Sequence, residues 1–244
     1  MSKHSGKIAV VTGGTGGLGR VVCERLLTSG AGVIALHSGV HDRTRDAAAM
    51  RERFPLYSEH AVDVRDSSAV AAFFGTEIAA RGRIDIICNL AGGVGPKSSL
   101  EDLSLQQFRE LFALNAESCF LMMSHALRFM KRAGTGRIIN IAARPAVIPE
   151  PNRGGYDVAK AAVIALTRSA AEEVKNSGTI TVNVIVPGTI LTEANKEWGS
   201  AEEMRRWVTP EQIADEILVL CGDNAIQMNG QIIHMFEKDD HGIT

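Results

Sequence analysis

Short runs of apolar, mostly β-branched residues alternate along the chain with longer segments whose apolar residues recur at helical spacing. The run at 84–88 is apolar except for Asp85, and its apolar part is continuous at 86–88, as expected of a strand that is buried on both faces. Together these runs predict strands at 7–12, 33–36, 58–64, 84–88, 137–141, 179–186 and 231–235. The longer segments predict helices at 20–28, 42–53, 67–80, 104–131, 156–174 and 210–220, and Ser104 is a residue type that caps helix N-termini.

This alternation of strands and helices predicts an α/β fold in which right-handed crossovers connect parallel strands and place helices on both faces. The expected architecture is a single doubly wound parallel sheet, formed by one domain over residues 1–244. Two segments, 92–102 and 191–208, resist assignment to helix or strand, and the candidate loops are 93–102, 144–153 and 191–208. Because open α/β sheets bind ligands beyond the carboxyl ends of their strands, we interpret these segments as substrate loops.

Composition narrows the class of protein. The chain has 244 residues, of which 45% are hydrophobic and 22% charged, and this excludes a disordered or coiled-coil chain. A net charge of −2 predicts no nucleic-acid partner, and the four scattered cysteines predict reduced thiols in the cytoplasm and no metal site. No signal-peptide pattern and no continuous apolar window of about 18 residues is found, so we expect no membrane association.

The glycine cluster at 12–19 (TGGTGGLG) lies between the first strand and the first helix. Glycines let the backbone turn sharply and approach a pyrophosphate, which the free N–H groups of the helix N-terminus then bind. The plainer alternative is a turn that only packs the helix against the strand. The cluster lacks the Lys-Ser/Thr pair of a P-loop, which argues against a nucleotide triphosphatase.

The second strand ends at His37 and Ser38, where NAD-binding sites commonly carry an acidic residue that holds the ribose 2′-hydroxyl. A carboxylate there would repel a 2′-phosphate, so its absence favours NADP(H), with NAD(H) as the second possibility. Ser38 could donate to the phosphate, and Arg43 or Arg45 could supply a counter-charge. Alternatively, His37 and His41 only occupy a solvated turn.

Two further strand ends carry candidate binding residues. Asp63 and Val64 close the third predicted strand, where the carboxylate could accept from an adenine amino group or cap the next helix. Asn89, Ala91 and Gly92 follow the fourth strand. Small residues there would let a cofactor lie flat against the sheet edge, although a plain glycine loop is the alternative.

Tyr156 and Lys160 are four residues apart on a predicted helix, so their side chains share one face. A nearby ammonium lowers the pKa of a phenol from about 10 and favours its ionised form. Tyr156 could then protonate a carbonyl oxygen as hydride arrives, or accept a hydroxyl proton in the reverse direction. A surface contact between the two side chains is the alternative.

In combination these motifs resemble the short-chain dehydrogenase/reductase family over nearly the whole chain, 7–235. The family's patterns appear as TGxxxGxG at 12–19, Asp63, NxAG at 89–92, YxxxK at 156–160, and Pro187-Gly188. The resemblance implies a Rossmann-type domain that binds NAD(P), and a catalytic set of Tyr156, Lys160 and Asn115. It implies that Lys160 orients the nicotinamide ribose. It also implies that Asn115 holds a water molecule that relays protons through Lys160. The implied cofactor-binding residues are Gly13, Thr15, Gly16, Gly17, Leu18, Gly19, His37, Ser38, Asp63, Val64, Asn89, Ala91, Gly92, Tyr156, Lys160, Pro187, Gly188, Ile190 and Thr192.

The chain departs from the family pattern at the catalytic serine, which lies thirteen residues before the tyrosine and is Ala143 here. Removing one oxyanion donor typically lowers a rate by about 10²–10³. The chain resembles dihydropteridine reductases in this respect, which implies an activated, for example quinonoid, substrate. Gly16 also stands where family members that bind NADP often have a basic residue, and 234–237 (HMFE) replaces the usual Asp-Gly-Gly.

We therefore predict an NAD(P)H-dependent oxidoreductase that reduces a small carbonyl or quinonoid substrate. The alternatives are a cofactor-binding sensor or scaffold that has lost turnover, and a 3-oxoacyl-thioester reductase in which Arg144 or Arg153 meets an anionic carrier. By resemblance the protein forms a homo-oligomer, a tetramer or dimer, through its two long helices. Trp198 and Trp207 are candidates for an apolar lid or for ordinary packing.

Overall fold

The computed structural model describes residues 4–39 and 44–236, without the side chains of 44–47. Seven strands form one sheet in the order β3-β2-β1-β4-β5-β6-β7, and every pair of neighbours is parallel. The strands are β1 (Ile8–Thr12), β2 (Gly32–His37), β3 (Tyr57–Ala61), β4 (Ile86–Asn89), β5 (Thr135–Ile141), β6 (Thr179–Pro187) and β7 (Ile232–Met235). The predicted doubly wound parallel sheet is confirmed.

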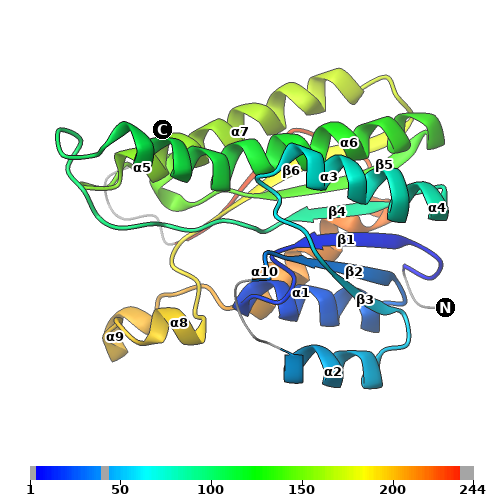
Figure 1. Cartoon of the computed structure of the whole chain (residues 1–244), viewed down its shortest axis with the longest axis horizontal. Helices are drawn as coiled ribbons and strands as arrows, with labels where there is room; N and C mark the ends of the chain where they lie inside the picture. Colours follow the sequence, from blue (N-terminus) through cyan, green and yellow to red (C-terminus); the bar gives the residue numbers. More distant parts are fainter. Residues whose placement is uncertain (1–3, 40–43, 237–244) are drawn as a thin grey trace.

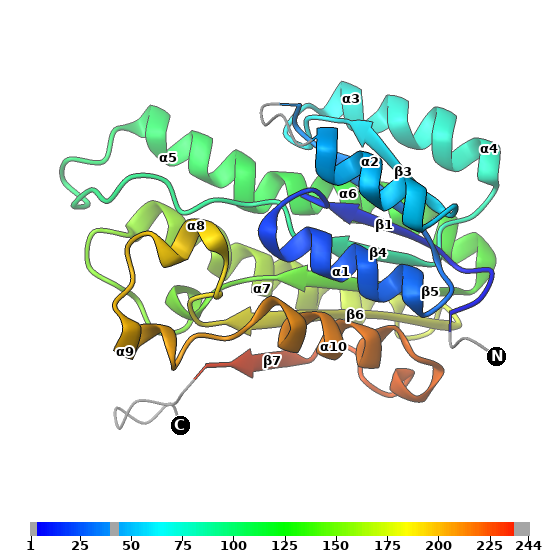
Figure 2. The same ribbon diagram turned by 90° about the horizontal axis from the view of Figure 1, so that it is seen from below.

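Helices cover both faces of this sheet (Figure 1). The helices of one face are α3 (Ser67–Phe73), α4 (Ala79–Arg81), α5 (Leu105–Phe112), α6 (Ser118–Ala133) and α7 (Gly154–Val174). Those of the other face are α1 (Gly17–Thr28), α2 (Thr44–Arg53) and α10 (Pro210–Cys221). Two short helices, α8 (Glu193–Lys196) and α9 (Ala201–Met204), lie beyond the carboxyl ends of the strands (Figure 2).

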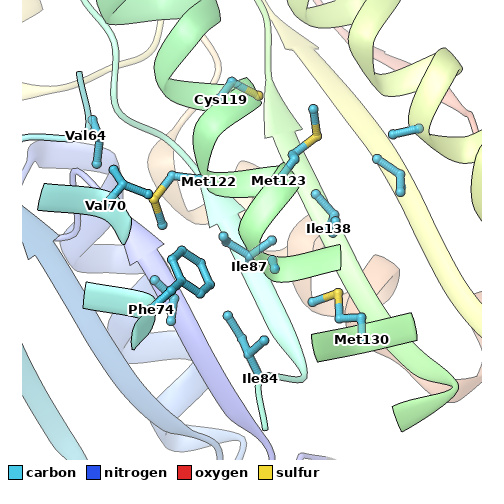
Figure 3. Close-up of a cluster of buried hydrophobic side chains, with 14 of the residues drawn as sticks. Val64, Val70, Phe74, Ile84, Ile87, Cys119, Met122, Met123, Met130 and Ile138 are labelled. Atoms are coloured by element: carbon cyan, nitrogen blue, oxygen red, sulfur yellow. The ribbon is translucent and has the colours of Figure 1, made fainter. Parts of the chain in front are cut away.

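The core consists of two apolar layers, one on each side of the sheet. Alternate residues of β4 supply both layers: Ile87 packs on the α3 and α6 side, while Ile86 and Cys88 pack on the α1 and α10 side. Methionines and Phe74 fill the first layer between helices and strands (Figure 3). The continuous apolar run of β4 is thus explained by burial on both faces, as predicted.

The predicted helix 104–131 forms with its expected cap, because Ser104 and Gln107 make a capping box. It is not uniform, however: a π-helical turn, Ala113–Glu117, joins α5 to α6. The amide of Asn115 donates to the Leu111 carbonyl over 2.9 Å, in competition with the regular backbone ladder. A second π-helical turn, Phe74–Ile78, similarly interrupts the predicted helix 67–80.

Two sequence assignments were wrong, one at the end of a strand and one in a segment expected to be irregular. The third strand ends at Ala61 and not at 64, because the Val62 amide makes one last bond to the His37 carbonyl and the chain then leaves the sheet. The segment 191–208 is not irregular throughout, since it contains α8 and α9. Ser200 and Glu203 form a capping box at the start of α9, a signal that was present in the sequence.

Within the described ranges, no helix combines the length and the apolar character that crossing a membrane requires. All four cysteines are buried and free.

Candidate active site

A cleft of about 490 Å³ opens at the carboxyl ends of β1, β2 and β4. Strand order reverses here, since β2 and β4 flank β1 while their connections run to opposite sides of the sheet. The cleft brings together most of the predicted cofactor residues. Its lining includes Gly13, Thr15, Gly16, Gly17, Leu18, Gly19, His37, Ser38, Asp63, Val64, Ala91 and Gly92.

The glycine turn between β1 and α1 is shaped by close backbone approaches. Gly13 adopts a left-handed φ of 65°, and a Cβ there would lie 3.3 Å from the backbone of Ala91. A Cβ on Gly19 would overlap the Gly13 carbonyl oxygen. No side chain caps α1 at Gly16, and its first turn, all of it described, carries no acidic residue. Free N–H groups and the positive end of the helix dipole therefore face the cleft, which fits the diphosphate of a dinucleotide.

His37 and Ser38 lie at the rim of this cleft. The Nδ1 atom of His37 accepts a hydrogen bond from the Gly39 amide over 3.1 Å, which orients the ring toward its own turn. Arg43, His41 and the side chain of Arg45 lie outside the part of the chain that the structure describes. The proposed counter-charge for a 2′-phosphate therefore stays a prediction.

Asp63 does not cap the following helix, contrary to the alternative considered from sequence. Asp66 does so, accepting from the Ser68 amide over 2.8 Å. Asp63 instead forms a two-pronged ion pair with Arg65, with contacts of 2.9 and 2.7 Å. This contact holds the pKa of the Asp63 carboxyl below its usual value. Arg65 also lines the cleft and was missed from sequence, where its position two residues after Asp63 was the available signal.

Asn89 lies outside the cleft lining, unlike its neighbours Ala91 and Gly92. Its buried amide donates to the Asn140 side-chain oxygen over 2.8 Å, inside a polar network between β4 and β5. The loop after β4 is held instead by Thr12. The Thr12 hydroxyl oxygen accepts from the amides of Leu90 and Ala91, both at 3.0 Å.

Asn115, Gly92 and Lys160 meet at the inner end of this loop. The Asn115 side chain exchanges two hydrogen bonds with the Gly93 backbone, of 2.9 and 3.1 Å. A Cβ on Gly92 would lie 2.7 Å from Asn115 Oδ1 and 3.1 Å from Lys160 Nζ. Asn115 and Lys160 are thus both close to Gly92. They can approach this position because Gly92 has no side chain.

Lys160 is buried, and its ammonium donates to the Ile141 carbonyl over 2.9 Å. Burial lowers the pKa of Lys160 to about 8. The same ammonium lies 5.9 Å from the centre of the Tyr156 ring. Both side chains therefore face the same side of α7, as their spacing predicts.

The expectation that Lys160 lowers the pKa of Tyr156 is wrong for the protein chain by itself. Burial dominates and raises the pKa of Tyr156 to about 12, and the cation that opposes this shift is Arg153. The phenol is consequently a protonated group at neutral pH. It can donate a hydrogen bond or a proton without first being charged.

Ala143 follows β5 in an extended conformation and is buried, with 7% of its surface exposed. It precedes a short 3₁₀ turn, Arg144–Ala146, which packs against α7. Arg144 forms an ion pair of 3.4 Å with Glu150. The chain therefore reaches the helix that carries Tyr156 directly after Ala143.

The segment after β6 reaches the first turn of α1. A Cβ on Gly17 would approach the Thr192 methyl group to 3.0 Å, so Thr192 lies over the first turn of α1. The Ile190 carbonyl accepts from the Asn195 amide over 2.9 Å, and Gly188 bonds to Met235. Pro187, Gly188, Ile190 and Thr192 are all outside the residues that line the cleft.

Comparison with known proteins gives consistent relatives. A family model described as short chain dehydrogenase matches residues 7–203. The chain is 31% identical to the D-beta-hydroxybutyrate dehydrogenase of Rhizobium meliloti (strain 1021), over 94% of this chain and 96% of that protein. It is 32% identical to the D-threitol dehydrogenase of Mycolicibacterium smegmatis, over 92% of this chain and 89% of that protein.

Solved structures resemble it in fold. An NAD+-bound xylitol dehydrogenase superposes with a TM-score of 0.87 at 26% identity, covering 97% of this chain and 100% of that one. A levodione reductase superposes with a TM-score of 0.86 at 26% identity, covering 95% and 96%. The chain thus belongs to the short-chain dehydrogenase family, whose members are oxidoreductases that act on hydroxyl or carbonyl groups with NAD(H) or NADP(H).

Proposed function

We propose that this protein is an NADP(H)-dependent reductase of a small carbonyl or quinonoid substrate, with Tyr156 as the general acid. The observation that carries the proposal is the convergence on Gly92 of an uncapped, glycine-lined helix N-terminus and the Asn115–Lys160 pair. The first element suits a dinucleotide phosphate, and the second lies where the reacting end of such a ligand would reach.

Most of the proposed cofactor residues line one cleft. The amides of 17–19 and the small residues Ala91 and Gly92 would hold the cofactor, and Thr192 would cover it from the far side. The Gly16 amide already donates to the Gly13 carbonyl oxygen over 2.9 Å. A bound nicotinamide cofactor supplies the hydride. The residues next to Ser38 in the sequence, His37 and Gly39, are not acidic, which supports a preference for NADP(H) over NAD(H). NAD(H) is the alternative cofactor, because one structural relative is described as NAD+-bound.

The proton is proposed to come from Tyr156. Its raised pKa keeps the phenol protonated at pH 7, which suits donation to a carbonyl oxygen during reduction. Lys160, with a pKa of about 8, is mostly cationic at that pH and stabilises the phenolate left behind.

Asn115 is proposed to support this step through the loop it holds. Both hydrogens of its amide are engaged, by the carbonyls of Leu111 and Gly93. The remaining acceptor capacity of Oδ1 points past Gly92 toward Lys160, the place where a relaying water would bind.

The missing hydroxyl at Ala143 supports an activated acceptor. Without a second donor to the developing oxyanion, a simple ketone is reduced slowly, whereas a quinonoid ring or a polarised dicarbonyl needs less help.

NADPH oxidation measured with a panel of ketones, diketones, quinones and quinonoid pterins tests the proposal. Turnover of at least one activated acceptor is expected. Tight cofactor binding without turnover of any would establish the sensor or scaffold alternative. Selective turnover of 3-oxoacyl thioesters would establish the thioester reductase.

The oligomeric proposal concerns an apolar groove between α5–α6 and α7. It is lined mainly by Phe112, Ala116, Phe120, Ala162, Ala165 and Leu166. Phe120 is 51% exposed on this face, so a second copy of the chain would bury it. Sedimentation of the parent protein and of Phe120→Glu tests this, since the variant is expected to be smaller. The free, buried cysteines fit the proposed cytoplasmic location.

A further inference from the structure

Arg153 stands at the start of the helix that carries Tyr156 and is held there by the backbone. Its carbonyl oxygen accepts from the amides of Tyr156 and Asp157, each at 2.9 Å. Arg153 and Tyr156 also line the same small cavity, of about 10 Å³, beneath the loop 93–102. Arg153 and Tyr156 therefore flank one cavity at the first turn of α7.

Among the described residues, Arg153 forms no ion pair with a carboxylate, although its charge does act on the Asp157 carboxyl and lowers that group's pKa. Its one side-chain hydrogen bond there is long, 3.5 Å from Nη1 to the Gly95 carbonyl. Glu150 pairs instead with Arg144, and Asp157 accepts from the Glu150 amide over 3.1 Å through one oxygen, while its buried Oδ1 has no hydrogen-bond partner. A guanidinium has five N–H donors, so most of its capacity is open to a ligand.

The backbone before Arg153 is strained in a way that sets its position. Asn152 has a φ of 63°, in the left-handed region that side chains other than glycine rarely occupy. The Asn152 carbonyl also accepts from the Ser98 amide over 3.1 Å, which ties the loop 144–153 to the loop 93–102. Arg153 is consequently placed by two loops and a helix before any ligand arrives.

The electrostatic effect of Arg153 reaches the phenol. It is the charge that most strongly lowers the pKa of Tyr156 against the larger, opposite effect of burial. An anion bound to Arg153 would therefore lie close to the atom that Tyr156 protonates.

We propose that Arg153 binds a carboxylate of the substrate, so that the physiological acceptor is an oxo acid whose carboxylate lies a few bonds from its carbonyl carbon. This inference rests on the proposed function. A planar carboxylate matches one guanidinium fork through two parallel hydrogen bonds. A phosphate or diphosphate would require further cations, and the neighbouring Arg144 is already paired.

The step is balanced as an ordinary reduction. The carbonyl carbon gains a hydride, the carbonyl oxygen gains the proton of Tyr156, and the carboxylate leaves unchanged as part of a hydroxy acid. Arg153 contributes by orienting the acid so that its carbonyl oxygen faces the phenol.

The test compares 2-, 3- and 4-oxopentanoate with their methyl esters, using NADPH and the full-length protein. At least one acid is expected to exceed its ester about tenfold in kcat/KM. Arg153→Gln should lower kcat/KM for that acid by about 10- to 100-fold, mainly through KM, as loss of charge-assisted hydrogen bonds implies. The same variant should lower kcat/KM for the ester by a clearly smaller factor, which reports the loss of the Arg153 charge near Tyr156, and Arg153→Lys should retain part of the preference.

Arg168→Gln is the matched control, because it makes the same change at an exposed position on the same helix. Equal losses for acid and ester in Arg153→Gln, or equal use of both by the parent protein, would overturn the carboxylate site while leaving the reductase proposal intact. Turnover of neither would instead count against the reductase proposal.

A binding measurement keeps the two failures apart. Calorimetric titration with 2-, 3- and 4-hydroxypentanoate and the corresponding amides needs no turnover. Tighter binding of an acid than of its amide, lost in Arg153→Gln and kept in Arg168→Gln, supports the site. Equal affinities for acid and amide would reject it whether or not the protein turns over.

Discussion

The two ends of the candidate active site differ in the atoms that form their surface. At the glycine end, around 13–19, the surface is backbone, and the space exists because Cβ atoms are absent. At the reacting end, around Ala143, Tyr156 and Lys160, the surface consists of half-buried and buried side chains whose ionisation is shifted by burial. In the proposed function, the first end would bind the cofactor through backbone groups that every residue has. The second end would carry out the chemistry, so that a change of a single atom should matter there.

This difference predicts which property, cofactor binding or reaction rate, a substitution at each end should change. Substitutions at the glycine end should weaken binding through steric overlap, whereas substitutions at the reacting end should change rates while binding persists. The following variants test the contrast, from the largest expected effect to the smallest.

Tyr156→Phe removes only the ionisable hydroxyl and keeps the ring. We expect turnover to fall by about 10²–10⁴-fold, because a required general acid contributes that much. Cofactor affinity, measured by fluorescence titration, should change less than threefold. Retention of more than about a tenth of the rate would show that another group delivers the proton.

Gly19→Ala adds a methyl group that overlaps the Gly13 carbonyl. Cofactor affinity should fall about 100-fold, since the turn must open to relieve the overlap and the free amides then lose their alignment. Gly75→Ala is the control, because a Cβ there meets nothing within 4 Å. Unchanged affinity in Gly19→Ala would mean that the turn does not hold the ligand.

Ala143→Ser restores a hydroxyl at the reacting end. Turnover of simple ketones should rise by about tenfold or more, within the range that one oxyanion donor supplies, while activated acceptors change far less. Steady-state kinetics on both substrate classes measures this. Equal, small effects on both would place Ala143 away from the reacting oxygen.

Ser38→Asp places a carboxylate at the rim of the cleft. It should erase or reverse a preference for NADPH by about tenfold, through repulsion of the 2′-phosphate. Titration of parent and variant with both cofactors gives the ratio. NADH bound tenfold more tightly by the parent protein would contradict the cofactor assignment.

Lys160 gives the smallest expected effect, a pH dependence. With a pKa of about 8, its charge is half lost at pH 8, so the rate should be about half-maximal there and fall further above it. The free energy of unfolding should instead increase as the pH rises above 8. Because the folded pKa lies below the ordinary value, the penalty for burying the charge is present below pH 8 and fades as the pH rises toward the unfolded pKa. Denaturant titrations of the parent and Lys160→Met, compared from pH 7 to 10, check the sign.

Much of the fold was predictable from the sequence because its signals are local. The apolar runs located all seven strands, and Ser104 located the start of α5. Element ends were less predictable, since they depend on partners: β3 stops where pairing with β2 stops. The π-helical turn at Asn115 depends on a side chain bonding to its own helix and to a distant loop, which no periodicity reveals.

The sequence by itself determined the glycine turn, the spacing of Tyr156 and Lys160 and the alanine in place of serine, because each is a matter of residue type and short-range order. Only the tertiary structure decided which charged groups pair with one another and which of them shift the pKa of Tyr156. It engaged Asp63 with Arg65 and moved Asn89 out of the cleft, and it made Arg153 the cation that opposes the burial of Tyr156. Ionisation depends on burial and on neighbours brought from elsewhere in the chain, and those are set by folding rather than by spacing.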